Sequence, residues 1–198
     1  MRLAIVQYGD PVLRAKGARV EKIDHRVREL AQNMIETMHA AHGIGLAAQQ
    51  IGEPLQLTVL DVSQVEDRPS TMKLNGENVD PKSAMPIVLI NPEITLGTQT
   101  ELSLEGCLSF PEITGDIERS IAATVRAEDL DGNEIEIEAT GLLARAIQHE
   151  VDHLNGILFI DRMSSAAKAA LSSKLKRLQK QTKRGQRLRA KDLEAVVT

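Results

Sequence analysis

The sequence has no tryptophan, two phenylalanines and one tyrosine, so aliphatic side chains must fill most of its core. A single cysteine excludes an internal disulfide framework and is typical of a reducing compartment. No stretch approaches the roughly 20 consecutive apolar residues of a membrane-spanning helix. The first residues also lack the long apolar run of a secretory signal. We therefore expect a cytoplasmic protein with no membrane contact.

What the chain does contain is an ordinary globular composition, 42% hydrophobic and 26% charged. Its net charge of −4 hides an asymmetry, because residues 164–198 hold ten Lys or Arg against two acidic residues. We predict a catalytic domain over residues 1–163 and a basic C-terminal helix and tail over 164–198. A basic appendage favours an acidic partner such as nucleic acid. The alternative is a solvated helix that only improves solubility.

Hydrophobic periodicity predicts an α+β fold with several short antiparallel strands around a central helix. We expect helices over residues 24–42 and 140–156 and from about 164 onwards. We expect strands over residues 3–8, 54–62, 86–92, 102–108, 121–130 and 133–139. Asp131-Gly132 predicts a hairpin turn between the last two strands. Residues 63–85 are polar and rich in turn formers, which indicates a surface loop.

The stretch QHEVDH at 148–153 indicates a metal site. His149 and His153 are four residues apart, so on a helix both side chains project from one face. Glu150 beside them fits the general base of an H-E-x-x-H metallohydrolase. Catalytic metals of this kind usually take three protein ligands, so one more ligand must lie elsewhere in the chain.

The third ligand is best supplied by Cys107 in the stretch SLEGCLSFP. The pattern that places a third histidine six residues after the second has Phe159 at that position, which excludes it. Asp161 follows the helix too closely to reach back easily. A lone cysteine is more often a small buried side chain than a ligand. Here, however, it completes a Cys-His-His set with one open position.

A third stretch, GIGLAAQQIG at 43–52, fits the spacing of a dinucleotide-binding loop only weakly, because a long helix precedes it where a strand is required. Its glycines, Gly45 among them, instead allow the backbone to pass close to an extended peptide. Gln50 would then offer a side-chain amide to a developing oxyanion. An ordinary buried amide that satisfies the local backbone is the alternative.

In this order and at this separation, GIGLAAQQ, EGCLS and QHEVDHLNG closely resemble the three motifs of peptide deformylases. The resemblance runs from YGDPVLR near the start to ILFIDR at 157–162. It implies an α+β fold in which antiparallel sheets pack around the helix that carries the two histidines. It also implies hydrolysis of the formyl group from N-formylmethionine on nascent polypeptides, with release of formate.

The resemblance assigns residue roles by motif match. Cys107, His149 and His153 are expected to hold Fe²⁺, for which Zn²⁺, Ni²⁺ or Co²⁺ can substitute. Glu150 is expected to act as acid and base. Gln50 and the backbone N–H of Leu108 are expected to bind the oxyanion. The position before Gln50, often proline in the family, is Gln49 here, a change that we expect to be tolerated.

The pocket for the methionine side chain should be apolar and should adjoin the motif residues. The candidates, for which plain core packing is the alternative, are Ile44, Gly45, Leu104, Ala146 and Ile147. Glu105 is expected to contact the catalytic residues. From family position, Asp152 is expected to pair with Arg119 as a buried brace.

The basic tail is expected to contact the ribosome, because the substrates emerge there and its surface is rich in RNA. Two other functions remain open at this point. A different metalloprotease or aminopeptidase would share the histidine helix without needing Cys107. A catalytically silent relative could serve only as a ribosome-binding module.

Overall fold

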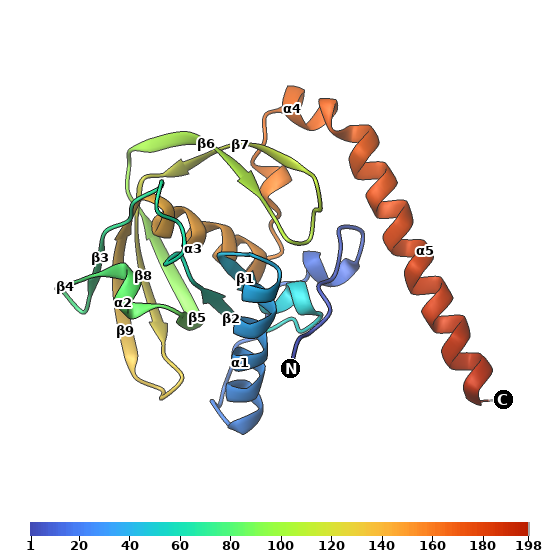
Figure 1. The fold of residues 1–198 in the computed structure, drawn as a ribbon, viewed down its shortest axis with the longest axis horizontal. Helices are drawn as coiled ribbons and strands as arrows, with labels where there is room; N and C mark the ends of the chain where they lie inside the picture. Colours follow the sequence, from blue (N-terminus) through green and yellow to red (C-terminus); the bar gives the residue numbers. More distant parts are fainter. Residues whose placement is uncertain (198) are drawn as a thin grey trace.

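The structure is a computed structural model that describes the backbone of residues 1–197 and the side chains of residues 1–188. It confirms the α+β prediction. One long helix, α3 (Gly141–Leu154), packs against a seven-stranded antiparallel sheet on one side and a two-stranded sheet on the other (Figure 1). None of the helices in the described part of the chain is both long and apolar enough to cross a bilayer.

The large sheet has the strand order β1-β2-β5-β8-β9-β3-β4, and the small sheet pairs β6 with β7. The strands are β1 (Gly45–Ala47), β2 (Leu57–Leu60), β3 (Met72–Leu74), β4 (Glu77–Val79), β5 (Ile87–Leu96), β6 (Thr100–Gly106), β7 (Thr114–Ser120), β8 (Ala122–Glu128) and β9 (Glu134–Thr140). The predicted hairpin at Asp131-Gly132 joins β8 to β9. Because β1 stands at one end of this order, it pairs with only one other strand of the sheet.

The remaining helices are α1 (His25–Ala40), α2 (Pro81–Ala84), α4 (Ser165–Ala170) and α5 (Ser172–Val197), with short 3-10 turns at Pro11–Arg14, Ala48–Ile51 and Phe159–Asp161. Asp24 begins α1 by accepting a hydrogen bond from the Val27 N–H, as expected of a capping aspartate. The buried residues of α1 recur at helical spacing and pack against β1 and β2.

Helix α3 is buried along almost its whole length, which explains why it can hold functional side chains rigidly. Leu143, Ile147 and Leu154 are fully buried. The first two pack against strands of the large sheet in one core cluster. The helix ends at Leu154, two residues before the predicted stop Gly156, which follows the cap Asn155 with a φ of 71°. The site residues on α3 therefore sit on a fixed scaffold.

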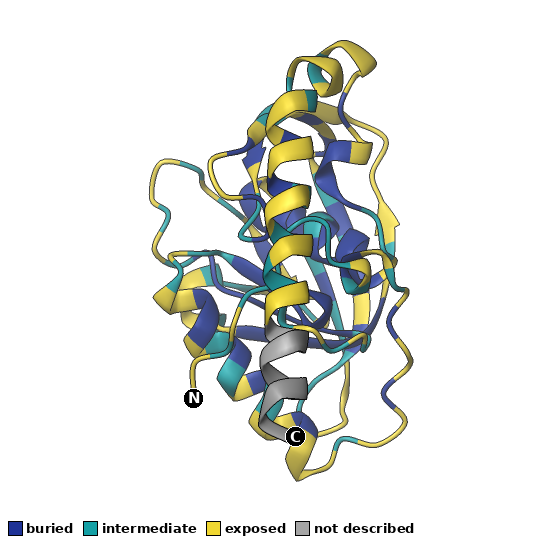
Figure 2. Cartoon of the chain, turned by 90° about the vertical axis from the view of Figure 1, so that its right-hand side faces the viewer, coloured by how far each residue is buried: buried dark blue, intermediate teal, exposed yellow. Residues whose placement is uncertain are grey.

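Helix α5 is not detached from the body. Leu175 and Leu178 are buried in a cluster with Phe110 and Phe159, and the Gln186 amide donates to Asp10 at 2.6 Å. The opposite face of α5 is exposed along its described length (Figure 2). The first half of the helix is thus anchored, and its outer face is open to solvent.

Two sequence-based predictions were wrong, and one strand was missed. Residues 3–8 form no strand, because their N–H groups pair with elements other than a strand: Val6 N–H donates to Gln50 O in a 3-10 turn and Tyr8 N–H to Ser109 O. Residues 63–85 are not a plain loop, since they contain β3, β4 and α2, and β3 extends the large sheet through β9. Strand β7 was missed because TGDIERS lacks an alternating apolar pattern; it forms by pairing along its length with β6.

Candidate metal centre and active site

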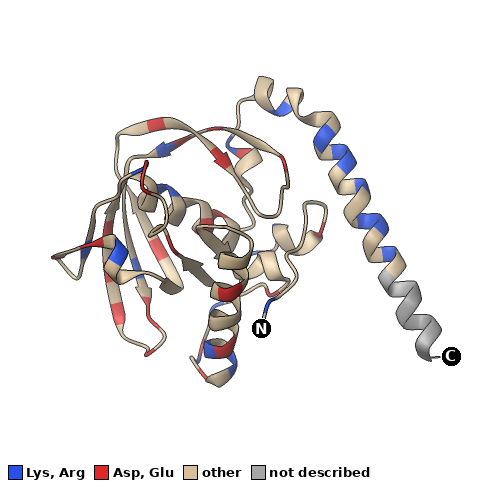
Figure 3. Ribbon diagram, viewed as in Figure 1, with Lys and Arg blue, Asp and Glu red and all other residues tan. Residues whose placement is uncertain are grey.

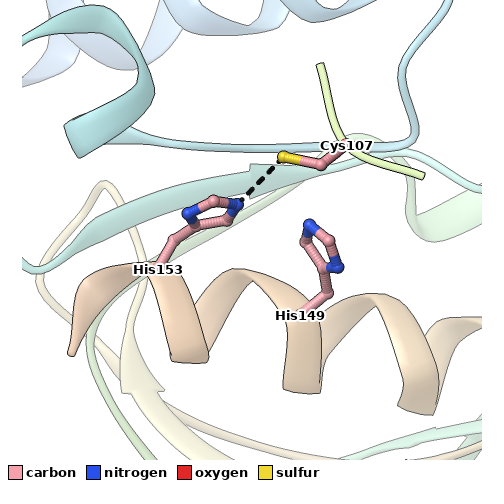
Figure 4. A group of neighbouring side chains, drawn as sticks. All are labelled: Cys107, His149 and His153. Carbon is pink, nitrogen blue, oxygen red and sulfur yellow. Dashed lines mark hydrogen bonds between the residues drawn. The ribbon is translucent and has the colours of Figure 1, made fainter. Parts of the chain in front are cut away.

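Two elements bring the predicted ligands together. Helix α3 presents His149 and His153 from consecutive turns, and Cys107 lies directly after β6 (Figure 4). The Cys107 Sγ is 3.3 Å from His153 Nε2. One ligand atom from each of the three residues lies within 4.8 Å of the others. This is a compact set of one sulfur and two imidazole nitrogens, the donor chemistry that suits Zn²⁺ or a similar divalent ion.

The surroundings of the two histidines shift their pKa values in opposite directions. Burial lowers the pKa of His149, but the neighbouring Cys107 sulfur and Glu105 carboxylate outweigh burial and raise it to about 10. The site therefore stabilises positive charge. Burial, followed by the charge of His149, holds the pKa of His153 well below its ordinary value. A cation bound at this site would take the place of the His149 proton, because an imidazole binds a metal in its neutral form. Among the described residues, the buried His153 Nδ1 has no hydrogen-bond partner.

Glu150 is the neighbour of His149 on α3, and its buried Oε2 has no hydrogen-bond partner in the part of the chain that the structure describes. Burial raises its pKa to about 7, although the charges of His149 and Arg119 act to lower it. A carboxyl group with this pKa can both accept and release a proton near neutral pH. Gly45 permits the approach, because a Cβ there would lie 2.7 Å from Glu150 Cδ.

Gln50 is buried, and hydrogen bonds fix the orientation of its side chain. Its Oε1 accepts the Ala47 N–H at 2.8 Å, which directs the amide nitrogen to Cys107 Sγ at 3.5 Å and Ser109 Oγ at 3.4 Å. The N–H of Leu108 makes no hydrogen bond within the described residues. The Gln50 amide therefore lies close to the sulfur, and the Leu108 N–H belongs to the residue that follows Cys107. Ser109, which sequence reasoning missed, has no distinguishing sequence signal beyond its place two residues after Cys107.

A buried ionic network holds the site in place. Glu105 accepts two hydrogen bonds from Arg119, at 2.9 and 3.0 Å, and one from His149 Nδ1 at 3.1 Å. Burial acts to raise the pKa of Glu105, but these bonds hold it far below its ordinary value. Arg119 also reaches Asp152 at 2.5 Å, which confirms the predicted brace, and Arg162 binds the same carboxylate. The network fixes the orientation of the His149 ring.

A cavity of about 470 Å³ opens onto these residues. The predicted pocket residues that line it are Ile44, Gly45, Leu104, Glu105 and Ala146, together with Gln50, Leu108, Cys107, His149 and Glu150. Ile147 was wrongly placed in the pocket, because it faces the sheet in the core cluster. Sequence reasoning missed Leu142, Phe110, Ile113 and Arg68, which other segments bring to the wall.

The chain is similar to known proteins over most of its length. The family model described as polypeptide deformylase matches residues 2–169. A peptide deformylase of Opitutus terrae is 48% identical over 190 residues, which cover 95% of this chain and 98% of that protein.

The chain is also similar to solved structures of peptide deformylases. The peptide deformylase of Thermotoga maritima superposes with a TM-score of 0.70 at 39% identity and covers 83% of this chain and 99% of its own. The enzyme of Synechococcus elongatus, solved in complex with actinonin, reaches 0.74 at 41% identity and covers 87% of each chain.

Proposed function

The chain belongs to the peptide deformylase family, and from this premise we propose which of its residues carry out the reaction. Members are metal-dependent hydrolases that remove the formyl group from the N-terminus of nascent polypeptides. The observation that carries the assignment of residues is the convergence of Cys107, His149 and His153 on one point beside Glu150.

Cys107, His149 and His153 would hold a single Fe²⁺, with Zn²⁺, Ni²⁺ or Co²⁺ as substitutes. A thiolate adds negative charge and softness to two imidazoles, a donor set that suits ferrous iron as well as zinc. Such an ion supplies Lewis-acid polarisation of the formyl oxygen and acidifies water. Glu105 supports the site by fixing the tautomer and orientation of His149.

Glu150 moves the proton. As an ionised carboxylate it accepts a proton from the water that attacks the formyl carbon. The protonated carboxyl then delivers this proton to the amine nitrogen of the departing peptide, so that formate and a free N-terminus result. Its pKa of about 7 and its burial beside the ligands support both steps.

Gln50 and the Leu108 N–H stabilise the negative charge that develops on the formyl oxygen. The hydrogen bond from Ala47 N–H fixes the Gln50 side chain before substrate arrives, so its amide needs no reorganisation during the reaction. Because β1 pairs on one side only, an extended peptide can align along its other edge beside Gly45. Ile44, Leu104 and Ala146 then offer apolar contacts to the methionine side chain.

The C-terminal part supports a second proposal. We divide the chain into a catalytic domain, 1–163, and a basic helix and tail, 164–198, that contacts ribosomal RNA in the cytoplasm. Seven of the described basic side chains on α5 are exposed, namely Lys174, Lys176, Arg177, Lys180, Lys183, Arg184 and Arg187. Figure 3 shows that basic positions recur along this helix, and the first six are those proposed to contact RNA. The tail charges at Arg189, Lys191, Asp192 and Glu194 lie outside the described side chains.

The test of the proposed residues and metal is anaerobic purification, metal analysis and an assay of formate release from formyl-Met-Ala-Ser. We expect about one iron per chain and activity that disappears with a chelator and returns with Fe²⁺. Glu150→Gln should keep the iron and lose turnover. An active enzyme without stoichiometric metal, or an active Glu150→Gln variant, would contradict the assignment.

A further inference from the structure

Residues 63–71, here called the strap, are docked onto the N-terminus of the catalytic helix. The Thr140 side chain does not cap α3; instead Ser70 Oγ accepts the Leu143 N–H at 2.9 Å. Thr71 and Thr140 pair through their hydroxyls at 2.6 Å. Gly141, at φ 63°, allows Pro69 to approach, because a Cβ there would overlap the Pro69 carbonyl. The strap is therefore held in a fixed place on the helix that carries the histidines.

The strap delivers Arg68 to the catalytic cavity. Its guanidinium donates through Nη2 to Ser103 Oγ on β6 at 3.2 Å, and Arg68 lines the cavity with Leu104. Arg68 is half-buried, whereas Leu104 is 57% exposed. Both thus belong to the mouth of the cavity, while Gln50 and Glu150 are buried in its floor. The mouth is where the peptide continues beyond the formyl-methionine.

Arg68 differs from Arg145, the other arginine of the cavity wall, in its charged partners. Arg145 also lines the wall, but it binds the Glu105 carboxylate at 2.7 Å and the carbonyls of Ile117 and Glu101. No carboxylate of the described residues lies within salt-bridge distance of Arg68. One of its five N–H donors serves Ser103, so the others are available to a molecule in the cavity.

We propose that Arg68 is a specificity-determining residue that binds an acidic side chain, Asp or Glu, at the second or third position of the substrate peptide. The inference rests on the proposed function, which places the formyl group on the cavity floor. An extended chain advances about 3.3 Å per residue, so the next one or two residues reach the mouth. Guanidinium binds carboxylate in planar, two-pronged geometry, and Ser103 holds it ready for this contact.

The test compares amidated peptides that differ by a single carboxylate: formyl-Met-Asp-Ala against formyl-Met-Asn-Ala, and formyl-Met-Ala-Asp against formyl-Met-Ala-Asn. We expect kcat/KM to favour Asp about fivefold at one position, as for a partly exposed ion pair. The higher kcat/KM of the Asp peptide should come from a lower KM, because the contact is remote from the reacting atoms. The preference should decrease as the salt concentration rises.

Three variants separate recognition from structure. Arg68→Ala should abolish the preference, so that kcat/KM on each Asp peptide becomes equal to that on its Asn partner, while Arg68→Lys should keep part of the preference. Arg26→Ala, remote from the cavity, should keep the full preference.

Different results would overturn the Arg68 proposal and the deformylase assignment. Equal kcat/KM within both peptide pairs, or a preference that survives Arg68→Ala, would overturn the proposal. Failure of the deformylase assignment itself would appear separately, as absence of formate from the Asn peptides.

Discussion

The Cys107 Sγ lies 3.3 Å from His153 Nε2, although the two residues are 46 positions apart in the chain. The sulfur comes from the end of β6 and the nitrogen from the fourth turn of α3, so neither local structure alone forms the site. The chemistry of the molecule depends on this tertiary contact.

Removal of the thiolate should therefore remove the metal. We expect Cys107→Ala to bind less than a tenth of the iron bound by the parent enzyme and to release formate at least 100-fold more slowly, since two imidazoles leave the ligand set incomplete. Metal analysis after desalting measures the first effect and the formate assay the second. Ser83→Ala, on exposed α2, is the control. Full iron content in Cys107→Ala would exclude the sulfur as a ligand.

The neighbouring amides Gln49 and Gln50 should behave differently. Gln50→Met removes a donor beside the reacting carbonyl and should lower kcat about 10²–10³-fold with metal retained. Gln49 is equally buried, but its amide donates to Leu154 O at 3.2 Å and does not line the cavity. Gln49→Met should therefore reduce the urea midpoint and leave kcat close to the parent value. Equal kcat losses in both variants would show that Gln50 acts only through packing.

Arg119 should be essential for stability. Arg119→Met leaves Glu105 and Asp152 without their shared partner in a buried setting, which typically costs about 3–5 kcal/mol. Urea unfolding followed by circular dichroism measures the loss. Lys73→Met breaks only an exposed pair with Glu138 and should unfold like the parent. If Arg119→Met does not accumulate, Arg162→Met provides a milder variant, and an unchanged midpoint in it would contradict the account.

Asp161 should make stability depend on pH. Burial acts to raise its pKa, but hydrogen bonds from Arg14, the Leu158 N–H and Lys168 lower it to about 2. A lowered folded-state pKa contributes stability that is fully present above the ordinary value of 3.8 and is lost as the pH falls towards about 2.

Asp161→Asn should therefore cost about 1 kcal/mol at pH 6, a figure reduced for the partial exposure of the pair. The difference in the free energy of unfolding between the variant and the parent should narrow as the pH falls from 4 towards 2. Urea midpoints across this range provide the measurement. If the difference between the two urea midpoints stays constant down to the lowest pH at which both proteins fold, the ionisation of Asp161 does not explain the loss of stability.

The outer face of α5 should carry ribosome binding. Truncation after Arg162 would also remove Leu175 and Leu178, which are buried, so substitution is the cleaner experiment. We expect a variant with four basic residues of α5 changed to glutamine to pellet with ribosomes at least tenfold less, because each lost phosphate contact weakens binding. The four residues are Lys176, Lys180, Lys183 and Arg184.

The matched control removes four exposed positive charges from the body, at Arg2, Lys16, Lys22 and Lys82. It should pellet like the parent protein, and both variants should hydrolyse formyl-Met-Ala-Ser at the parent rate. Equal pelleting of the two variants would show that net charge, not the helix face, governs binding.

Local sequence patterns predicted the parts of the fold that depend on local physics. The helical spacing around His149 and His153, the capping by Asp24 and the turn at Asp131-Gly132 are short-range signals, and the structure confirms the elements that they predict. Strand β7 escaped prediction because TGDIERS lacks an alternating apolar pattern, and the contacts that stabilise it are long-range: pairing with β6, burial of Ile117 and the bonds of Arg119. The strand predicted over residues 3–8 was wrong for the opposite reason: the side chains are typical of a strand, but no strand of the described chain pairs with them.

The sequence by itself determined which residue types could form the site: one cysteine, two histidines four apart and a glutamate between them. Only the tertiary structure decided the contacts that join distant segments. Arg68 reaches the cavity because Ser70 docks on α3, and Arg119 meets both Glu105 and Asp152 because β7 pairs with β6 beside that helix. Such contacts are set by packing and by the pairing of buried charges, which depend on the whole chain and leave no periodic signal in its sequence.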